Sequence, residues 1–158
     1  MIGADMKKID WKNLSYYDFI GFVAVTAILL FALYFGGLWY ATYDYRIQMR
    51  DQMVGMYQQL PEPLPPIEDD YGVHQRWLVF YIDGVKVLNK PQPENVINEY
   101  RKALEKEGWA AEREYVRNDK NKTYGINMRK GEFVLTVSAR ENRDSINIHL
   151  IKRDWIYN

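Results

Sequence analysis

The 158-residue chain contains no cysteine. This absence excludes disulfide bonds, iron–sulfur ligation, thiol catalysis and an acylated N-terminal cysteine, but it is compatible with either redox compartment. Histidine is scarce: His74 and His149 are the two present, and neither lies in an HExxH motif or another closely spaced ligand pattern. We therefore expect both histidines to be solvated or locally hydrogen-bonded, and we expect no metal and no cofactor.

Recognisable catalytic patterns are also lacking. Ser138 and Ser145 have no Gly-x-Ser-x-Gly context, and the glycines are isolated, so no phosphate-cradling loop is present. Glu112 and Glu114 are spaced to lie on one face of a strand, but cross-strand ion pairs explain them without a catalytic mechanism. We expect that the protein is not an enzyme and has no catalytic residue.

No strong charge of one sign is present. Lys and Arg number 21 and Asp and Glu number 21, so the formal net charge is zero. From residue 73 onward there are 16 basic and 12 acidic residues, a mild surplus without a tight basic cluster. A nucleic-acid-binding surface usually shows such a cluster, so we expect an ordinary solvated surface and no nucleic acid partner.

Residues 19–40, FIGFVAVTAILLFALYFGGLWY, contain no charge and no proline. A helix of these 22 residues would be about 33 Å long, enough to cross a bilayer core of about 30 Å. A cleaved signal peptide has a shorter apolar region and a small-x-small cleavage site, whereas bulky aromatics crowd the end of this stretch. The sequence therefore predicts an uncleaved transmembrane helix that follows a polar tail over residues 1–18.

Basic residues on the two sides of this helix bear on its orientation. Lys7, Lys8 and Lys12 precede the helix, and Arg46 and Arg50 follow it. Basic residues favour the cytoplasmic side, so three against two predicts a cytoplasmic N-terminus and an extracytoplasmic domain, periplasmic or external.

Small residues gather on one side of the predicted transmembrane helix. At 100° per residue, a sector of about 120° contains Gly21, Ala24, Ala32 and Gly36. Small residues let transmembrane helices approach closely, so this side is a candidate packing face for a neighbouring helix. Chance is the other interpretation, because Gly and Ala are common in such helices.

Two segments connect this helix to the rest of the chain. Residues 41–60 lack proline and are expected to continue as a helical stalk, in which Met49, Met53 and Met56 form either an adaptable contact surface or a side that lies on the chain's own domain. Residues 61–72 are rich in proline and acidic side chains, which favours an extended, semi-rigid linker.

Residues 73–158 predict a small α+β domain in the order ββαββββ, with an antiparallel sheet packed on one amphipathic helix. A first hairpin is expected to turn at Asp83-Gly84, since Asp-Gly is a strong hairpin signal. A helix is expected from Pro93 to Gly108, because apolar residues recur at helical spacing between a proline and a glycine. The rest predicts an antiparallel meander of four further strands at 110–117, 123–129, 132–139 and 145–152, and apolar and polar residues alternate cleanly in the last three.

The last strands also predict a polar sheet face, opposite the face that would pack on the helix. A partner surface there, with the apolar C-terminus, would include Asn127, Thr136, Ser138, Arg140, Asn147, His149, Trp155 and Tyr157. A plain solvated sheet face has the same composition, so both interpretations stay open.

These features predict a noncatalytic, single-pass accessory, assembly or structural subunit of a larger membrane protein complex. Its partners would be the membrane and other transmembrane subunits. The alternative is a membrane-anchored module that binds an envelope glycan or peptide on the polar sheet face. An anchored hydrolase or isomerase is a third hypothesis, with His149 or Glu132 as the residues to test.

Overall fold

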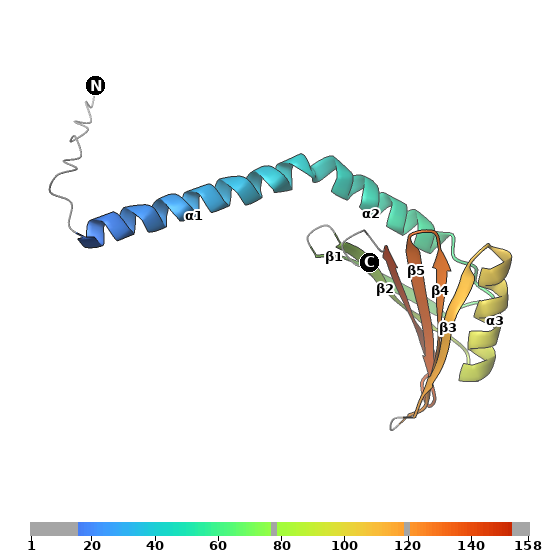
Figure 1. The fold of residues 1–158 in the computed structure, drawn as a ribbon. Coiled ribbons are helices and arrows are strands. Elements are labelled where there is room, and N and C mark those ends of the chain that lie inside the picture. The colour runs from blue at the N-terminus through green and yellow to red at the C-terminus, as the bar shows by residue number, and fades with distance from the viewer. Residues whose placement is uncertain (1–15, 77–78, 119–120, 153–158) are drawn as a thin grey trace. The chain divides into compact units, whose positions relative to one another are not determined.

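The computed structural model describes residues 16–76, 79–118 and 121–152 (Figure 1). The chain forms two units, residues 1–44 and residues 45–158. The first unit contains helix α1 (Tyr16–Ala41), and the second contains nearly all of helix α2 (Tyr43–Gln58) and the whole of the α+β domain.

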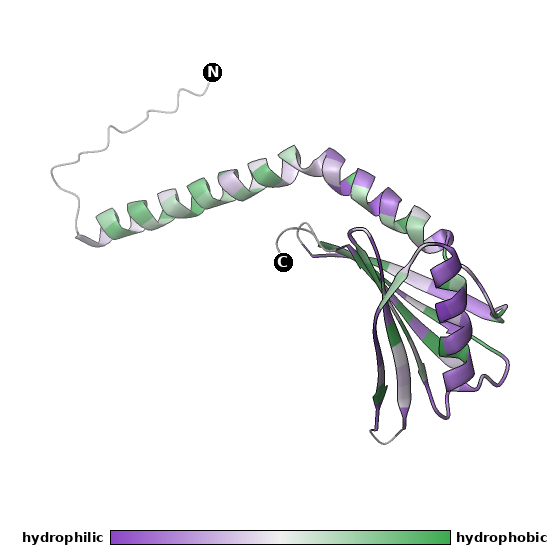
Figure 2. Cartoon of the chain, turned by 45° about the vertical axis from the view of Figure 1, so that its right-hand side comes forward, coloured by the Kyte–Doolittle hydropathy of each residue, from purple (hydrophilic) through white to green (hydrophobic). Residues whose placement is uncertain are grey.

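Helix α1 is long and apolar enough to cross a membrane. It has 26 residues, none of its side chains is buried, and Asp18 in the first turn is its one charged residue. In Figure 2 most of the helix is hydrophobic or neutral in colour along its length. A helix that is apolar on all sides requires either a surrounding core or lipid, and the described chain supplies no core around it.

The domain contains a six-stranded antiparallel sheet, so the predicted α+β class is confirmed. The strands are β1 (Glu68–Arg76), β2 (Val79–Val87), β3 (Ala110–Arg117), β4 (Thr123–Lys130), β5 (Phe133–Arg140) and β6 (Ser145–Lys152). Their order across the sheet is β1-β2-β6-β5-β4-β3, so the C-terminal strand lies beside β2 in the middle. Strands β1 and β3 are the two edges.

Helix α3 (Pro93–Lys106) packs as its amphipathic pattern predicts. Proline stands in its first turn, and its buried residues are Val96, Ile97, Tyr100 and Leu104. Gly108 follows the helix with φ +83°, and the Trp109 N–H donates to the Leu104 carbonyl at 3.0 Å. In Figure 2 the outer side of α3 is hydrophilic.

Helix α2 belongs to the domain core and does not stand apart as a stalk. Met49 and Met53 are buried in the same hydrophobic cluster as α3 and the sheet, and Met56 packs against that cluster. The methionines therefore lie on the chain's own domain, which was one of the two alternatives. The prediction of a sheet packed on a single amphipathic helix was incomplete, because α2 supplies a second packed helix.

The start of the predicted domain was wrong in two respects. Asp83 and Gly84 lie in the middle of β2, where they pair with Gly72 and Tyr71 of β1, so they do not form a turn. The first hairpin instead lies between Arg76 and Val79, and its connecting residues are outside the described part. The predicted linker 61–72 also ends early, because β1 begins at Glu68 and extends the sheet.

Candidate interaction surface

The open face of the sheet is the face whose side chains do not enter the core. Strand register places five polar side chains in one row across it, each opposite the next. From β3 to β2 the row is Arg113, Asn127, Thr136, His149 and Asp83. Cross-strand neighbours on one face lie close enough to interact. The row therefore joins positions that are far apart in the sequence.

The other predicted surface residues lie on the same face. Ser138 is opposite Asn147, and Arg140 is opposite Thr123. The Arg140 Nε donates to the Thr123 hydroxyl at 3.3 Å. Trp155 and Tyr157 lie outside the described residues. The binding role of these side chains stays a prediction.

The open face brings the chain's two histidines together around one carboxylate. His149 Nδ1 lies 2.6 Å from Asp83 Oδ1, and His74 Nε2 lies 3.8 Å from Asp83 Oδ2. The Tyr81 ring stacks on His74 with centroids 5.0 Å apart and lies 5.6 Å from the His149 ring. The sequence did not predict this cluster. The first hairpin was predicted to turn at Asp83-Gly84, too late in the chain, whereas the observed pairing of β1 with β2 brings His74 close to Asp83.

The histidine cluster is small and solvent-exposed. His74, Asp83 and His149 have side chains that are 49%, 52% and 42% exposed. Within the described residues, no group of three or more His, Asp or Glu side chains is arranged to hold a metal ion.

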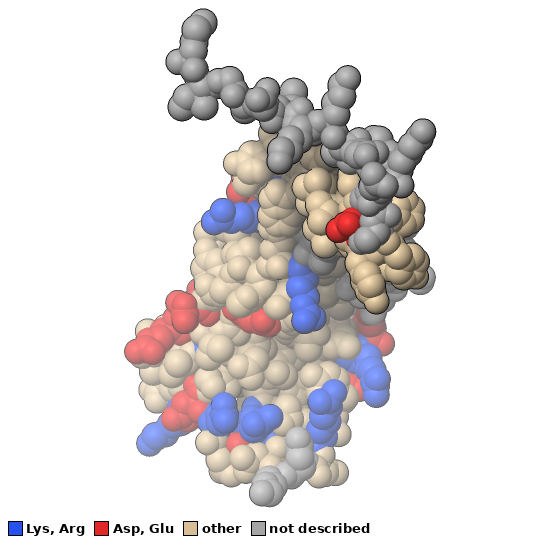
Figure 3. Space-filling view, turned by 90° about the vertical axis from the view of Figure 1, so that its left-hand side faces the viewer, with Lys and Arg blue, Asp and Glu red and all other residues tan. Residues whose placement is uncertain are grey.

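On the face that Figure 3 views, acidic and basic side chains are intermixed with broad uncharged areas.

A hollow of about 330 Å³ lies at the β3 end of the open face. Its lining comprises Arg113, Tyr115, Val116, Arg117, Asn127 and Thr136. The hydroxyl of Thr136 donates to Asn127 Oδ1 at 3.0 Å, which leaves the amide NH₂ of Asn127 as a donor. The polar lining therefore consists mainly of hydrogen-bond donors, with no carboxylate.

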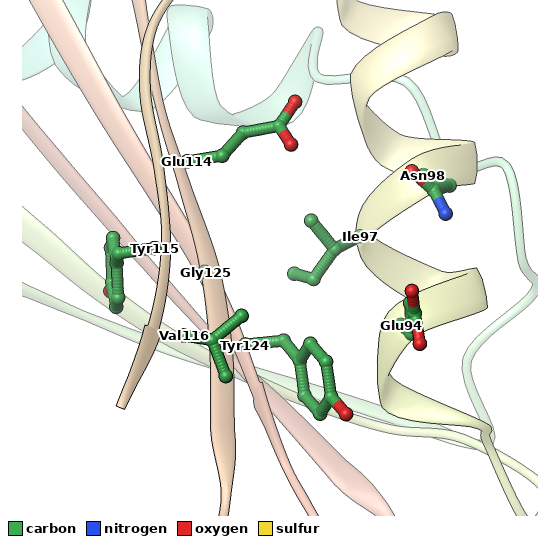
Figure 4. A pocket seen from close by; sticks show the side chains of 8 residues that line it. All are labelled: Glu94, Ile97, Asn98, Glu114, Tyr115, Val116, Tyr124 and Gly125. Atoms are coloured by element: carbon green, nitrogen blue, oxygen red, sulfur yellow. The ribbon is translucent and has the colours of Figure 1, made fainter. Parts of the chain in front are cut away.

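A second hollow, of about 230 Å³, opens between α3 and strands β3 and β4 (Figure 4). Glu94 of α3 and Glu114 of β3 both line it, and the Ile97 side chain extends from α3 toward the strands. Glu114 is neutralised by Arg101 at 2.6 Å, and Glu112 pairs with Arg129 at 3.3 Å. The expected cross-strand ion pair is thus found for Glu112, whereas the partner of Glu114 is on helix α3. Glu112 and Glu114 therefore each have a basic partner of their own and are not paired with each other.

A buried charge, which no sequence pattern predicted, lies on the core side of β2. The Lys86 side chain is 4% exposed, and its ammonium contacts the carboxylates of Glu62 and Asp69, the latter at 3.0 Å. The Tyr57 hydroxyl donates to Asp69 at 3.3 Å, and the Tyr100 hydroxyl is buried without a hydrogen-bond partner among the described residues. These contacts join α2, the segment after it, β1 and β2.

The same cluster shifts three pKa values upward. Burial raises the pKa of Tyr57 above its ordinary value, and the charge of Asp69 and its hydrogen bond add to the effect. Burial also raises the pKa of Tyr100, with the charges of Glu62 and Asp69 in support. Burial disfavours charged Lys86, but its hydrogen bonds to Glu62 and Asp69 outweigh that effect and raise its pKa.

The small residues of α1 have no packing role within the described chain. A Cβ atom added at Gly21 or at Gly36 would meet nothing within 4 Å, and the same holds at Gly37. The packing of this chain on itself therefore does not require glycine at these positions. The predicted packing face of Gly21, Ala24, Ala32 and Gly36 stays a prediction.

Comparisons with models of known protein families, with characterised proteins and with solved structures give no match to this chain.

Proposed function

We propose that this chain is a noncatalytic, single-pass accessory or assembly subunit of a larger membrane protein complex. In this proposal α1 lies in the bilayer against other transmembrane helices, and the extracytoplasmic domain docks on partner proteins. The observation that carries the proposal is α1 itself: 26 residues with no buried side chain, charged at Asp18 alone. Such a helix needs an apolar environment that the rest of the described chain does not provide.

The small residues of α1 support a protein neighbour within the bilayer. Lipid cannot drive helix association by the hydrophobic effect, so association depends on close backbone contact at small side chains. Gly36 belongs to the predicted packing face, and both it and Gly37 have open space where a Cβ would lie. Gly37 follows Gly36 by 100° of helical rotation and points away from that face, so it provides a matched control.

The test measures the native size of the complex after gentle solubilisation of the membrane. The wild-type chain should migrate in a larger assembly and cross-link to partner subunits. Gly36→Leu should release it from the assembly, whereas Gly37→Leu should leave the assembly intact. Migration of the wild-type chain as a lone monomer, without a cross-linked partner, would contradict the proposal.

Orientation has a separate test, which the lack of cysteine makes simple. Single cysteines at Lys7 and at the exposed Arg143 can be probed in intact cells with a membrane-impermeant thiol reagent. Labelling of the Arg143→Cys variant and protection of the Lys7→Cys variant are expected for a cytoplasmic N-terminus. The reverse pattern would place the domain in the cytoplasm.

A further inference from the structure

Strand β3 ends the sheet with an unpaired edge. It pairs with β4 on one side, and no other described strand pairs with its second side. The register shifts between Ala111 and Arg113, so the regular part of this edge is the segment from Arg113 to Arg117. An edge of this kind leaves backbone N–H and C=O groups available to another extended chain.

The side chains of this segment favour a partner of one charge. Arg113, Tyr115 and Arg117 occupy alternate positions, so they project on the same open face of the sheet. Neither arginine has an ion-pair partner within the described residues, whereas Arg101 and Arg129 are paired with Glu114 and Glu112. Both unpaired arginines are exposed and line the hollow of about 330 Å³.

Tyr115 gives the hollow a fixed wall. A Cβ atom at Gly125 would overlap the Tyr115 ring, so the ring lies directly against the backbone of β4. The Arg117 guanidinium lies 5.2 Å from the centre of the same ring. With the Asn127 amide already oriented by Thr136, the site offers two guanidinium groups and an amide donor before any partner binds.

We propose that the β3 edge is a docking strand for an extended, acidic polypeptide segment of a partner protein. The segment would pair its backbone with Arg113–Arg117 and place Asp or Glu side chains, at alternate positions, opposite the two arginines. This inference rests on the proposed subunit function, since it names the surface that docks on the partner. The complementary charge specifies the partner's chemistry, and the free strand edge specifies its conformation.

The test uses the full chain in detergent micelles and a fluorescent ten-residue peptide with Glu at alternate positions and Thr or Val between them. Fluorescence anisotropy should show binding that is at least ten-fold tighter than that of the same peptide with Gln in place of Glu. The double variant Arg113→Gln/Arg117→Gln should weaken binding at least ten-fold. The charge-matched double variant Arg76→Gln/Arg143→Gln should bind as the wild type does, because neither arginine lines the hollow.

N-methylated peptides separate backbone pairing from simple charge attraction. Methylation of the amides along one edge of the peptide should abolish binding, and methylation along the other edge should leave it intact. Equal binding of both methylated peptides would overturn docking on the strand edge. So would equally tight binding of an oligogalacturonate or of inorganic phosphate, since the site would then recognise an anion alone.

Three further outcomes keep this inference separate from the proposed function. The full chain could self-associate in a concentration-dependent way, and the variant Glu68→Gln/Asp70→Gln could remove that self-association. This result would mean that the β1 edge of a second copy occupies the site, and it would overturn the partner-protein proposal. A lone monomer after gentle solubilisation, combined with tight peptide binding, would contradict the subunit function and support the docking strand. An intact complex that persists in the Arg113→Gln/Arg117→Gln variant, without peptide binding, would overturn the docking strand alone.

Discussion

The Tyr57 side chain of α2 lies directly against the backbone of Gly84 in β2, so closely that a Cβ atom at Gly84 would overlap the Tyr57 hydroxyl. Gly84→Ala should therefore displace Tyr57 and destabilise the domain by about 1–3 kcal/mol, the usual cost of overpacking. The free energy of unfolding, measured by denaturant titration of the full chain in micelles, checks this.

Gly55 of α2 is the matched control for Gly84. A Cβ atom there would meet nothing within 4 Å, and the residue lies inside a helix. Gly55→Ala should stabilise the domain by about 0.5–1 kcal/mol, since alanine loses less backbone entropy in a helix. Equal effects of the two substitutions would mean that the Tyr57 contact has no role in stability.

The buried ammonium of Lys86 should contribute to stability through its two carboxylate partners. Lys86→Ala should destabilise the domain by about 2 kcal/mol, a value below that of a fully buried ion pair because Glu62 is 47% and Asp69 31% exposed. Lys86→Met, which keeps the apolar stem, should cost less than Lys86→Ala. The exposed pair of Lys102 with Glu99 provides the control, and Lys102→Ala should change stability by no more than about 0.5 kcal/mol.

Tyr100→Phe should stabilise the domain, which is unusual for a substitution in a core. Tyr100 is 1% exposed, and no described residue forms a hydrogen bond with its buried hydroxyl. Removal of an unsatisfied buried hydroxyl is expected to gain about 1 kcal/mol while the ring stays in place. Tyr57→Phe should have the opposite sign, because it removes the hydrogen bond to Asp69. Thermal unfolding of the two variants side by side checks this pair.

Alkaline pH should weaken the domain. The pKa values of Tyr57, Lys86 and Tyr100 are all raised in the folded state, so above about pH 10 the unfolded chain loses protons that the folded chain retains. The free energy of unfolding then falls as pH rises, whereas this contribution is fully present at pH 7. The variant Tyr57→Phe/Tyr100→Phe should show a shallower decline between pH 9 and about pH 11. An unchanged decline in that variant would assign the pH dependence to other groups.

The sequence predicted the later part of the domain well because local signals there agree with the tertiary structure. Strands β3 and β6 have the predicted bounds, β4 ends one residue later than predicted, and β5 begins and ends one residue later. Strands β4, β5 and β6 alternate apolar and polar residues between clear turns, and α3 has its apolar residues at helical spacing. The open-face positions of Asn127, Thr136 and His149 followed directly from this alternation.

The start of the domain was harder to predict because its glycine and acidic residues are explained by contacts with distant parts of the chain and not by local structure. Asp83-Gly84 is a hairpin signal in isolation, yet glycine is required there by the approach of Tyr57 from α2. The acidic residues after the prolines suggested a solvated linker, whereas Asp69 is a strand residue that pairs with buried Lys86. No local pattern could reveal the histidine cluster, or that Arg113 lacks an ion-pair partner within the described ranges, since both depend on strand register and on which strand lies at the edge.

Thr42 is the single residue between the end of α1 and the start of α2, and α2 is already part of the domain core. The chain therefore passes across one residue from a helix with no buried side chain to a helix that contributes buried side chains. A change of chain length at Thr42 would leave the core positions Met49, Met53 and Tyr57 in place, so the connection can be altered without altering the core.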